Sequence, residues 1–90
     1  MHPAATLSLA ILLAACVTAT EAPDDLRTRQ MAACTATIAA HVNRPASVIT
    51  TRWVSESAGL AQVETLDGTR RHLCIVDGAA RVLSYSHPEG

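Results

Sequence analysis

Cysteine and histidine are the residue types of this sequence whose side chains could carry chemistry, and each occurs only a few times. The cysteines are Cys16, Cys34 and Cys74, and the histidines beyond residue 15 are His41, His72 and His87. A thiolate can act as a nucleophile or a metal ligand, and two thiols can form a disulfide. The histidines are dispersed, and no pair of these residues has Cys-x-x-Cys or His-x-x-x-His spacing. We therefore predict no redox centre, no metal site and no cofactor.

The remaining polar residues do not suggest catalysis either. Ser84 and Ser86 flank Tyr85 without the glycines of a nucleophile elbow, and there is no glycine-rich phosphate loop. For His41 we predict a structural role in the last turn of a helix, where a cation is favoured. For His72 we predict a half-buried ring with its hydrogen bonds satisfied. We expect no catalytic residue and no enzyme, and the seven basic residues against eight acidic ones argue against a nucleic-acid partner.

Residues 1–15 have the length and composition of a cleaved export signal. The run from Ala4 to Ala15 is almost wholly apolar, but it is shorter than the roughly 20 residues that a transmembrane helix needs. It ends in Leu13-Ala14-Ala15-Cys16: a branched apolar residue, two small residues and a cysteine. This motif resembles the lipobox of small bacterial lipoproteins. The resemblance implies cleavage before Cys16 and lipid (diacylglyceryl and palmitate-type acyl chains) on that residue.

A lipid on Cys16 would anchor the protein in the bacterial cell envelope, since several acyl chains give stable membrane attachment. Val17 stands where an aspartate would resemble an inner-membrane retention signal, so the resemblance favours the outer membrane, facing the periplasm. Residues 16–23 would then be the lipidated cysteine and a tether, and residues 24–90 a small domain. The alternative is an ordinary secretory signal cleaved after Ala19, which would leave a soluble periplasmic protein.

The domain is predicted to begin with an amphipathic helix. Asp24 and Asp25 offer an N-cap and favourable negative charge, and no glycine or proline interrupts residues 26–42. Gln30 is expected to fall largely outside the apolar face. Asn43-Arg44-Pro45 ends the helix because the residue before a proline is excluded from the helical region. Spacings of three and four define one apolar stripe, widened by Ala39, that consists of Met31, Cys34, Ile38 and Val42.

After the helix the pattern changes to β. Four segments are predicted as strands, with turn residues between them: 47–56, 60–66, 69–76 and 81–86. Asp67-Gly68 is a strong signal for a two-residue hairpin, and in the register that it implies Glu64 faces Arg71 as an opposite-charge pair. The predicted fold class is α+β: one N-terminal amphipathic helix packed on a three- to four-stranded antiparallel β-meander, with one disulfide.

This register divides the side chains of the two central strands between two faces. One face carries Ala61, Val63, His72, Cys74 and Val76, and the other carries Leu60, Leu66, Leu73 and Ile75. Cys74 then points at the helical stripe that contains Cys34, and export implies an oxidising compartment. We predict a Cys34–Cys74 disulfide, whose loop of about 40 residues corresponds to roughly 4 kcal/mol. Cys16 is left as the odd cysteine, in agreement with its lipidation.

A single helix can cover only one face of such a sheet. The other face would expose an apolar patch, with Ile49 or Trp53 nearby, and such patches usually mark a contact surface. We predict a protein partner or a homodimer on the surface formed by Leu60, Leu66, Leu73 and Ile75. The alternative is that the tether or the C-terminal segment folds over this face.

The domain resembles small uncharacterised periplasmic proteins of proteobacteria over about Met31 to Leu83, through a helical cysteine, a Cys-x-Val step and an Asp-Gly turn. The resemblance implies a fold and no activity. It is also broadly similar to accessory lipoproteins of outer-membrane assembly, without their second helix. We therefore expect a non-catalytic interaction or accessory module. The alternative from a different class is an inhibitor of a periplasmic or exogenous hydrolase of the lysozyme type.

Overall fold

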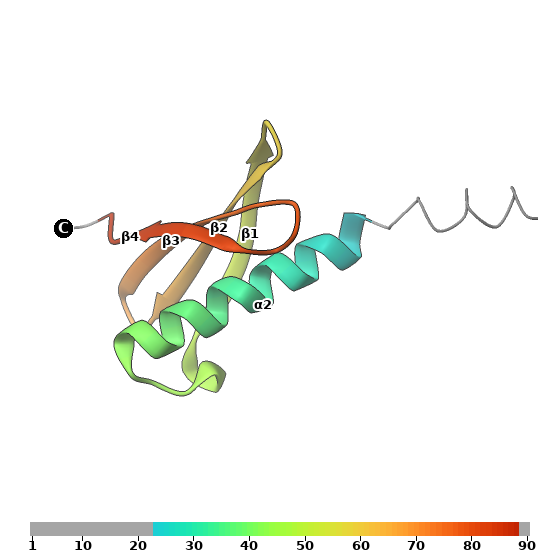
Figure 1. The fold of residues 1–90 in the computed structure, drawn as a ribbon. Coiled ribbons are helices and arrows are strands. Elements are labelled where there is room, and N and C mark those ends of the chain that lie inside the picture. The colour runs from blue at the N-terminus through green and yellow to red at the C-terminus, as the bar shows by residue number, and fades with distance from the viewer. Residues whose placement is uncertain (1–22, 89–90) are drawn as a thin grey trace, which may run out of the picture.

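The computed structural model describes residues 23–88, which fold as a helix followed by an antiparallel sheet (Figure 1). The elements are α2 (Pro23–Val42), the 3-10 helix η2 (Ala46–Val48), β1 (Thr50–Ser57), β2 (Leu60–Asp67), β3 (Arg70–Val76) and β4 (Val82–Ser86). The strands form one sheet in the order β1-β2-β3-β4, and α2 packs across all four of them. The predicted α+β fold class is confirmed for the described residues, and the sheet has four strands.

The start of α2 differs slightly from the prediction. The helix begins at Pro23, so Asp24 and Asp25 lie in its first turn and neither is the N-cap residue. Proline suits this position because the N–H group that it lacks would have no partner there. The two carboxylates still interact favourably with the positive end of the helix dipole.

The end of α2 is a Schellman motif. Asn43 has a φ of 58°, in the left-handed region that asparagine tolerates. The Asn43 N–H donates to the carbonyl oxygen of Ala40 at 3.3 Å, and the Arg44 N–H donates to that of Ala39 at 3.0 Å. The helix therefore ends through the conformation of Asn43 as well as through the following Pro45.

Two tight hairpins set the register of the sheet. The Ala58-Gly59 turn between β1 and β2 has positive φ at both residues, 53° and 81°, as in a type I′ turn. Between β2 and β3, Asp67 pairs with Arg70, so the loop is Gly68-Thr69. The predicted Asp67-Gly68 loop is wrong: Gly68, with a φ of 64°, takes the first loop position, as in a type II′ turn. The register shifts by two residues, which leaves every side chain on its predicted face.

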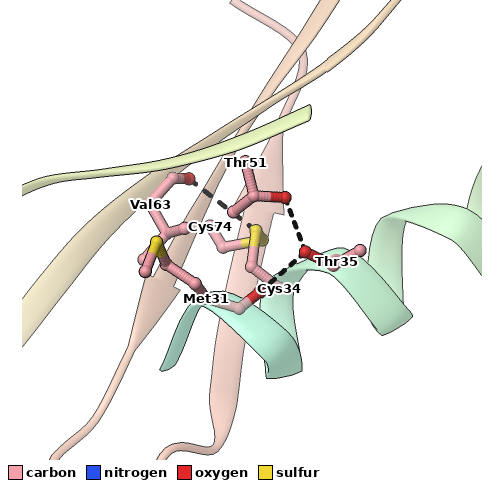
Figure 2. Close-up of a disulfide and its surroundings, with 6 residues drawn as sticks. All are labelled: Met31, Cys34, Thr35, Thr51, Val63 and Cys74. Carbon is pink, nitrogen blue, oxygen red and sulfur yellow. Dashed lines mark hydrogen bonds between the residues drawn. A yellow bond between two sulfur atoms is a disulfide. The ribbon is translucent and has the colours of Figure 1, made fainter. Parts of the chain in front are cut away.

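The core lies between α2 and the sheet and contains the predicted disulfide, which is confirmed (Figure 2). The Cα atoms of Cys34 and Cys74 are 5.9 Å apart. The buried core consists of Cys34, Ile38, Ala61, Val63, Cys74 and Val76, with Met31, Val42, Trp53 and Val82 packed against it. The predicted helical stripe and the helix-facing side of the sheet are therefore the core.

Polar contacts beside the disulfide connect α2 to a different strand (Figure 2). Thr35 Oγ1 donates to the carbonyl oxygen of Met31 at 2.8 Å and also shares a hydrogen bond with the hydroxyl of Thr51 on β1. Because a hydroxyl has a single proton, Thr51 is the donor in that second bond. Cys34 Sγ lies 3.7 Å from the carbonyl oxygen of Val63. Because a disulfide sulfur carries no hydrogen, this is a van der Waals contact and not a hydrogen bond. The middle of α2 is thus joined to both β1 and β3.

Candidate interaction surface

The residues predicted to form a partner surface all lie on the sheet face that points away from α2, which we call the outer face. On β2 and β3 this face consists of Leu60, Gln62, Glu64, Leu66, Arg71, Leu73 and Ile75, and β1 adds Arg52. Leu60 and Leu66 are 40% and 37% exposed, whereas Leu73 and Ile75 are half-buried. The apolar side chains alternate with polar ones, since Leu66 pairs with Arg71 and Leu73 pairs with Glu64.

A carboxylate held by two arginines occupies the centre of the outer face. Glu64 Oε1 accepts hydrogen bonds from Nε and Nη2 of Arg52 at 3.2 and 3.0 Å, and Oε2 accepts one from Nη1 of Arg71 at 3.0 Å. The predicted Glu64–Arg71 pair is present, but it is diagonal, because Glu64 directly faces Leu73. The hydrogen bonds from Arg71 and Arg52 hold the pKa of Glu64 below its ordinary value, although burial acts in the opposite direction.

The cluster leaves positive charge accessible at the surface. Arg52 donates both Nε and Nη2 to a single oxygen of Glu64, and its side chain is 67% exposed. Guanidinium groups bind carboxylates in a planar, bidentate geometry. Because Leu60 and Leu66 are exposed on the same face, the outer face is complementary to a carboxylate flanked by apolar groups.

Trp53 lies on the helix side of the sheet, and the prediction that it neighbours the outer face is wrong. It pairs with Val63, which belongs to the core. Its Nε1–H donates to Gln30 Oε1 at 2.8 Å, and the Arg27 guanidinium carbon lies 4.1 Å from the ring centroid, a cation–π contact. An open pocket of about 230 Å³ lies here, lined by Leu26, Arg27, Gln30, Trp53, Glu56, Gly59 and Gly78.

Gln30 is buried, so the prediction that it falls outside the apolar face is also wrong. Its Nε2 donates to the carbonyl oxygen of Asp77, after β3, at 3.0 Å, while its Oε1 accepts the proton of Trp53. The signal for this position was its spacing, because Gln30 lies four residues before Cys34 and therefore on the same side of the helix. Gln30 thus fastens the first half of α2 to the sheet by polar contacts.

The histidines that the sequence leaves dispersed come together at the opposite end of α2. We call His41, His72 and His87 the histidine cluster. The His72 ring centroid is 5.4 Å from that of His41 and 4.7 Å from that of His87. His41 Nδ1 lies 3.3 Å from the hydroxyl oxygen of Tyr85. The β3–β4 pairing brings His87 beside His72 on the helix side, and the last turn of α2 places His41 against them.

His72 is only 2% exposed, so the prediction of a half-buried, satisfied ring is wrong. Its Nδ1 has no hydrogen-bond partner, and neither has Oγ1 of Thr65, the residue opposite it on β2. Burial lowers the pKa of His72 below its ordinary value, and the charges of His87 and His41 lower it further. His72 is therefore neutral at pH 7. Among residues 23–88, no group of three His, Cys, Asp or Glu side chains is placed to hold a metal ion.

Cys16, the predicted lipidation residue, lies outside the described residues, as does the leader before it. From Pro23 to Pro88, no helix is both long and apolar enough to cross a membrane. Comparison of the chain with protein-family models, curated proteins and solved structures found no match. The resemblances to bacterial lipoproteins and to small periplasmic proteins stay predictions.

Proposed function

We propose that this chain is a lipid-anchored protein of the bacterial cell envelope, attached through Cys16, with a non-catalytic interaction module as its domain. The observation that carries the proposal is the Cys34–Cys74 disulfide. It uses both cysteines of the domain, and a disulfide of this kind persists in an oxidising compartment outside the cytosol. The remaining cysteine is the one that ends Leu13-Ala14-Ala15-Cys16. Export and lipidation together account for all three cysteines, and Val17 favours the outer membrane, facing the periplasm.

Metabolic labelling with an alkyne analogue of palmitate tests the anchor. In a bacterial host, we expect label on the wild-type chain and none on Cys16→Ser. The matched control is Cys34→Ser/Cys74→Ser, which should be labelled in proportion to its abundance. Label on Cys16→Ser would refute the anchor. So would an unlabelled wild-type chain whose N-terminus, determined by mass spectrometry, follows Ala19; that result would identify a soluble periplasmic protein.

The outer face is the proposed interaction surface, and the proposed partner is a protein that presents carboxylates among apolar side chains. This choice rests on the exposed guanidinium of Arg52 and on the exposed side chains of Leu60 and Leu66. A second copy of the chain fits less well, because two outer faces in contact would bury the exposed guanidinium of Arg52 from each copy against like charge.

Site-specific photo-crosslinking in cells tests this surface. A photoreactive amino acid replaces Leu66, and the control replaces Ala36, an exposed residue of α2 on the opposite side of the molecule. We expect a heteromeric adduct from position 66 alone, weakened by Arg52→Gln and unchanged by Arg29→Gln on the helix. Equal adducts from both positions, adducts of two copies only, or no effect of Arg52→Gln would refute the proposed partner. If the captured partner is a hydrolase that the purified chain blocks in a lysis assay, the module acts as an inhibitor.

A further inference from the structure

The two halves of α2 are attached to the sheet in different ways. Cys34 is joined covalently to β3, and Gln30 is hydrogen-bonded to Trp53 and Asp77. The last turn has no covalent link to the sheet; it meets the sheet through the ring of His41, which shares a 3.3 Å hydrogen bond with the hydroxyl of Tyr85 and contacts the ring of His72, and through Val42, which packs against the core. The polar contacts of this end of α2 with β3 and β4 are therefore made by the imidazole ring of His41.

The surroundings of His72 disfavour a positive charge from almost every side. The groups around it are His41 of α2, Asp67 of β2, Arg70 of β3 itself and His87 just after β4, and Tyr85 of β4 lies against His41. Asp67 is the one anion of this set, and it is already shared by Arg44 at 3.7 Å and Arg70 at 3.1 Å. A proton on His72 would thus be a buried cation among other cations, without a carboxylate of its own.

We propose that the histidine cluster is a pH-sensitive switch: at acidic pH, proton uptake separates the last turn of α2 and the end of β4 from the sheet. At neutral pH the three rings are packed edge to face and the end of the helix is closed. A proton on His72 places a buried positive charge 5.4 Å from the His41 ring and 4.7 Å from the His87 ring, and His72 must reach water to carry it. The disulfide keeps the middle of α2 on β3, so the opening is local. This inference depends on neither the lipid anchor nor the outer face.

The direction of the pH dependence follows from burial. Burial, then His87 and His41, lower the pKa of His72. The closed form therefore binds the proton less tightly than the open form does. The closed form is fully stable above the ordinary pKa of histidine, and its stability falls as the pH drops below that value towards the lowered one. In the closed form neither Nδ1 of His72 nor Oγ1 of Thr65 has a hydrogen-bond partner, so neither atom adds a hydrogen bond that stabilises this form.

Hydrogen–deuterium exchange of the full chain in detergent micelles, read by mass spectrometry at pH 7.5 and pH 5.0, tests the switch. Reductant is added at the quench to separate the disulfide-linked peptides, and rates are corrected for the intrinsic effect of pH. We expect exchange to accelerate at least tenfold at pH 5.0 in peptides covering residues 39–44 and 82–87. Peptides of β1 and β2 should be unchanged. Equal protection at both pH values, or a uniform acceleration over the whole sheet, would overturn the proposal.

Variants separate the switch from a general acid effect. His72→Phe retains a buried ring that cannot titrate, and it should lose the acid response. An unchanged response in that variant would overturn the proposal. If His72→Phe does not fold, the double variant His41→Asn/His87→Asn is the test, because both residues are exposed. In that variant the acceleration of exchange at pH 5.0 should shrink at least threefold, and an undiminished acceleration would refute the proposed switch. We expect the pKa of His72, measured by NMR in the wild-type chain, to lie below the ordinary histidine pKa. A pKa at or above that value would also overturn the proposal.

Discussion

Removal of the Cys34–Cys74 disulfide should take away much of the stability of this domain. The two residues are 40 positions apart in the sequence. In the chain-entropy model, closing a loop of this length corresponds to roughly 4 kcal/mol at 25 °C. Proteins have about 0.05–0.15 kcal/mol of stability per residue, or roughly 3–10 kcal/mol for residues 23–88. Both sulfur atoms are also in the buried core, so Cys34→Ala/Cys74→Ala adds a small cavity to the entropic loss.

Urea unfolding followed by tryptophan fluorescence measures this effect, because Trp53 is the single tryptophan of the sequence. It packs against the core and is hydrogen-bonded to Gln30, so unfolding changes its environment. All variants carry Cys16→Ser to remove the third thiol. We expect a loss of about 3–5 kcal/mol in the free energy of unfolding. The dependence on urea should become steeper, since a chain without the cross-link exposes more surface when it unfolds.

The wild-type domain with its disulfide reduced is the matched comparison. It keeps the sulfur atoms but lacks the cross-link, so it should resemble the double alanine variant to within about 1 kcal/mol. If oxidised and reduced proteins unfold at the same urea concentration, the cross-link contributes nothing and the reasoning is refuted. If only the alanine variant is weakened, packing of the sulfur atoms is responsible and the chain-entropy account is wrong.

Three further predictions use the same unfolding assay. Glu64→Gln should lower the free energy of unfolding by about 1–3 kcal/mol at pH 7, because it removes the charge from the hydrogen bonds to the arginines. Since the pKa of Glu64 is lowered, the wild-type protein should be more stable than this variant above the ordinary carboxyl pKa, and the difference should vanish as the pH falls below that pKa. Equal losses at pH 7 and pH 3 would contradict this. Asn43→Ala should lower the free energy of unfolding by about 1 kcal/mol, because alanine is disfavoured in the left-handed conformation at the end of α2, whereas Asn43→Gly should be near neutral. Equal effects of the two substitutions would refute the role of Asn43 in ending the helix. Ala58→Asn should raise the free energy of unfolding by about 0.5–1 kcal/mol, because asparagine tolerates the positive φ of this type I′ turn better than alanine does. A loss of stability would show that the positive φ of Ala58 does not destabilise the wild-type turn.

Much of the fold follows from two periodicities in the sequence. The helical stripe through Cys34 and Ile38 and the alternation along β2 and β3 identify the two surfaces that form the core. The hairpin loop was misplaced by one residue, since Gly68 occupies the first loop position and not the second. That error moved the register by two residues. Because side chains alternate with a period of two, the core, the disulfide and the outer face were assigned correctly all the same.

The histidine cluster could not be found from the sequence, because its members meet only after the last hairpin is placed. The β3–β4 loop is longer than a tight turn, and Asp77 organises it by accepting hydrogen bonds from the backbone of Ala79 and Arg81. A bulge at Ile75/Val76 then shifts the pairing within β4. Neither feature has a periodic signal, so the face of Tyr85 and the position of His87 were undetermined. The sequence alone therefore leaves His41, His72 and His87 dispersed, at separations of 31 and 15 positions.

Three of the attachments of α2 to the sheet respond differently to pH, so the proposed switch and the proposed partner surface can be tested separately. Gln30 holds the first half through neutral hydrogen bonds, and the disulfide at Cys34 holds the middle through a covalent bond. Neither attachment contains a group that titrates between pH 5 and pH 8, whereas the end of the helix packs against the buried imidazole of His72. On the outer face, Glu64 stays ionised over that range because its pKa is lowered. Acidification to pH 5 should therefore open one end of α2 while the arginine–glutamate cluster, and any partner bound there, stays in place.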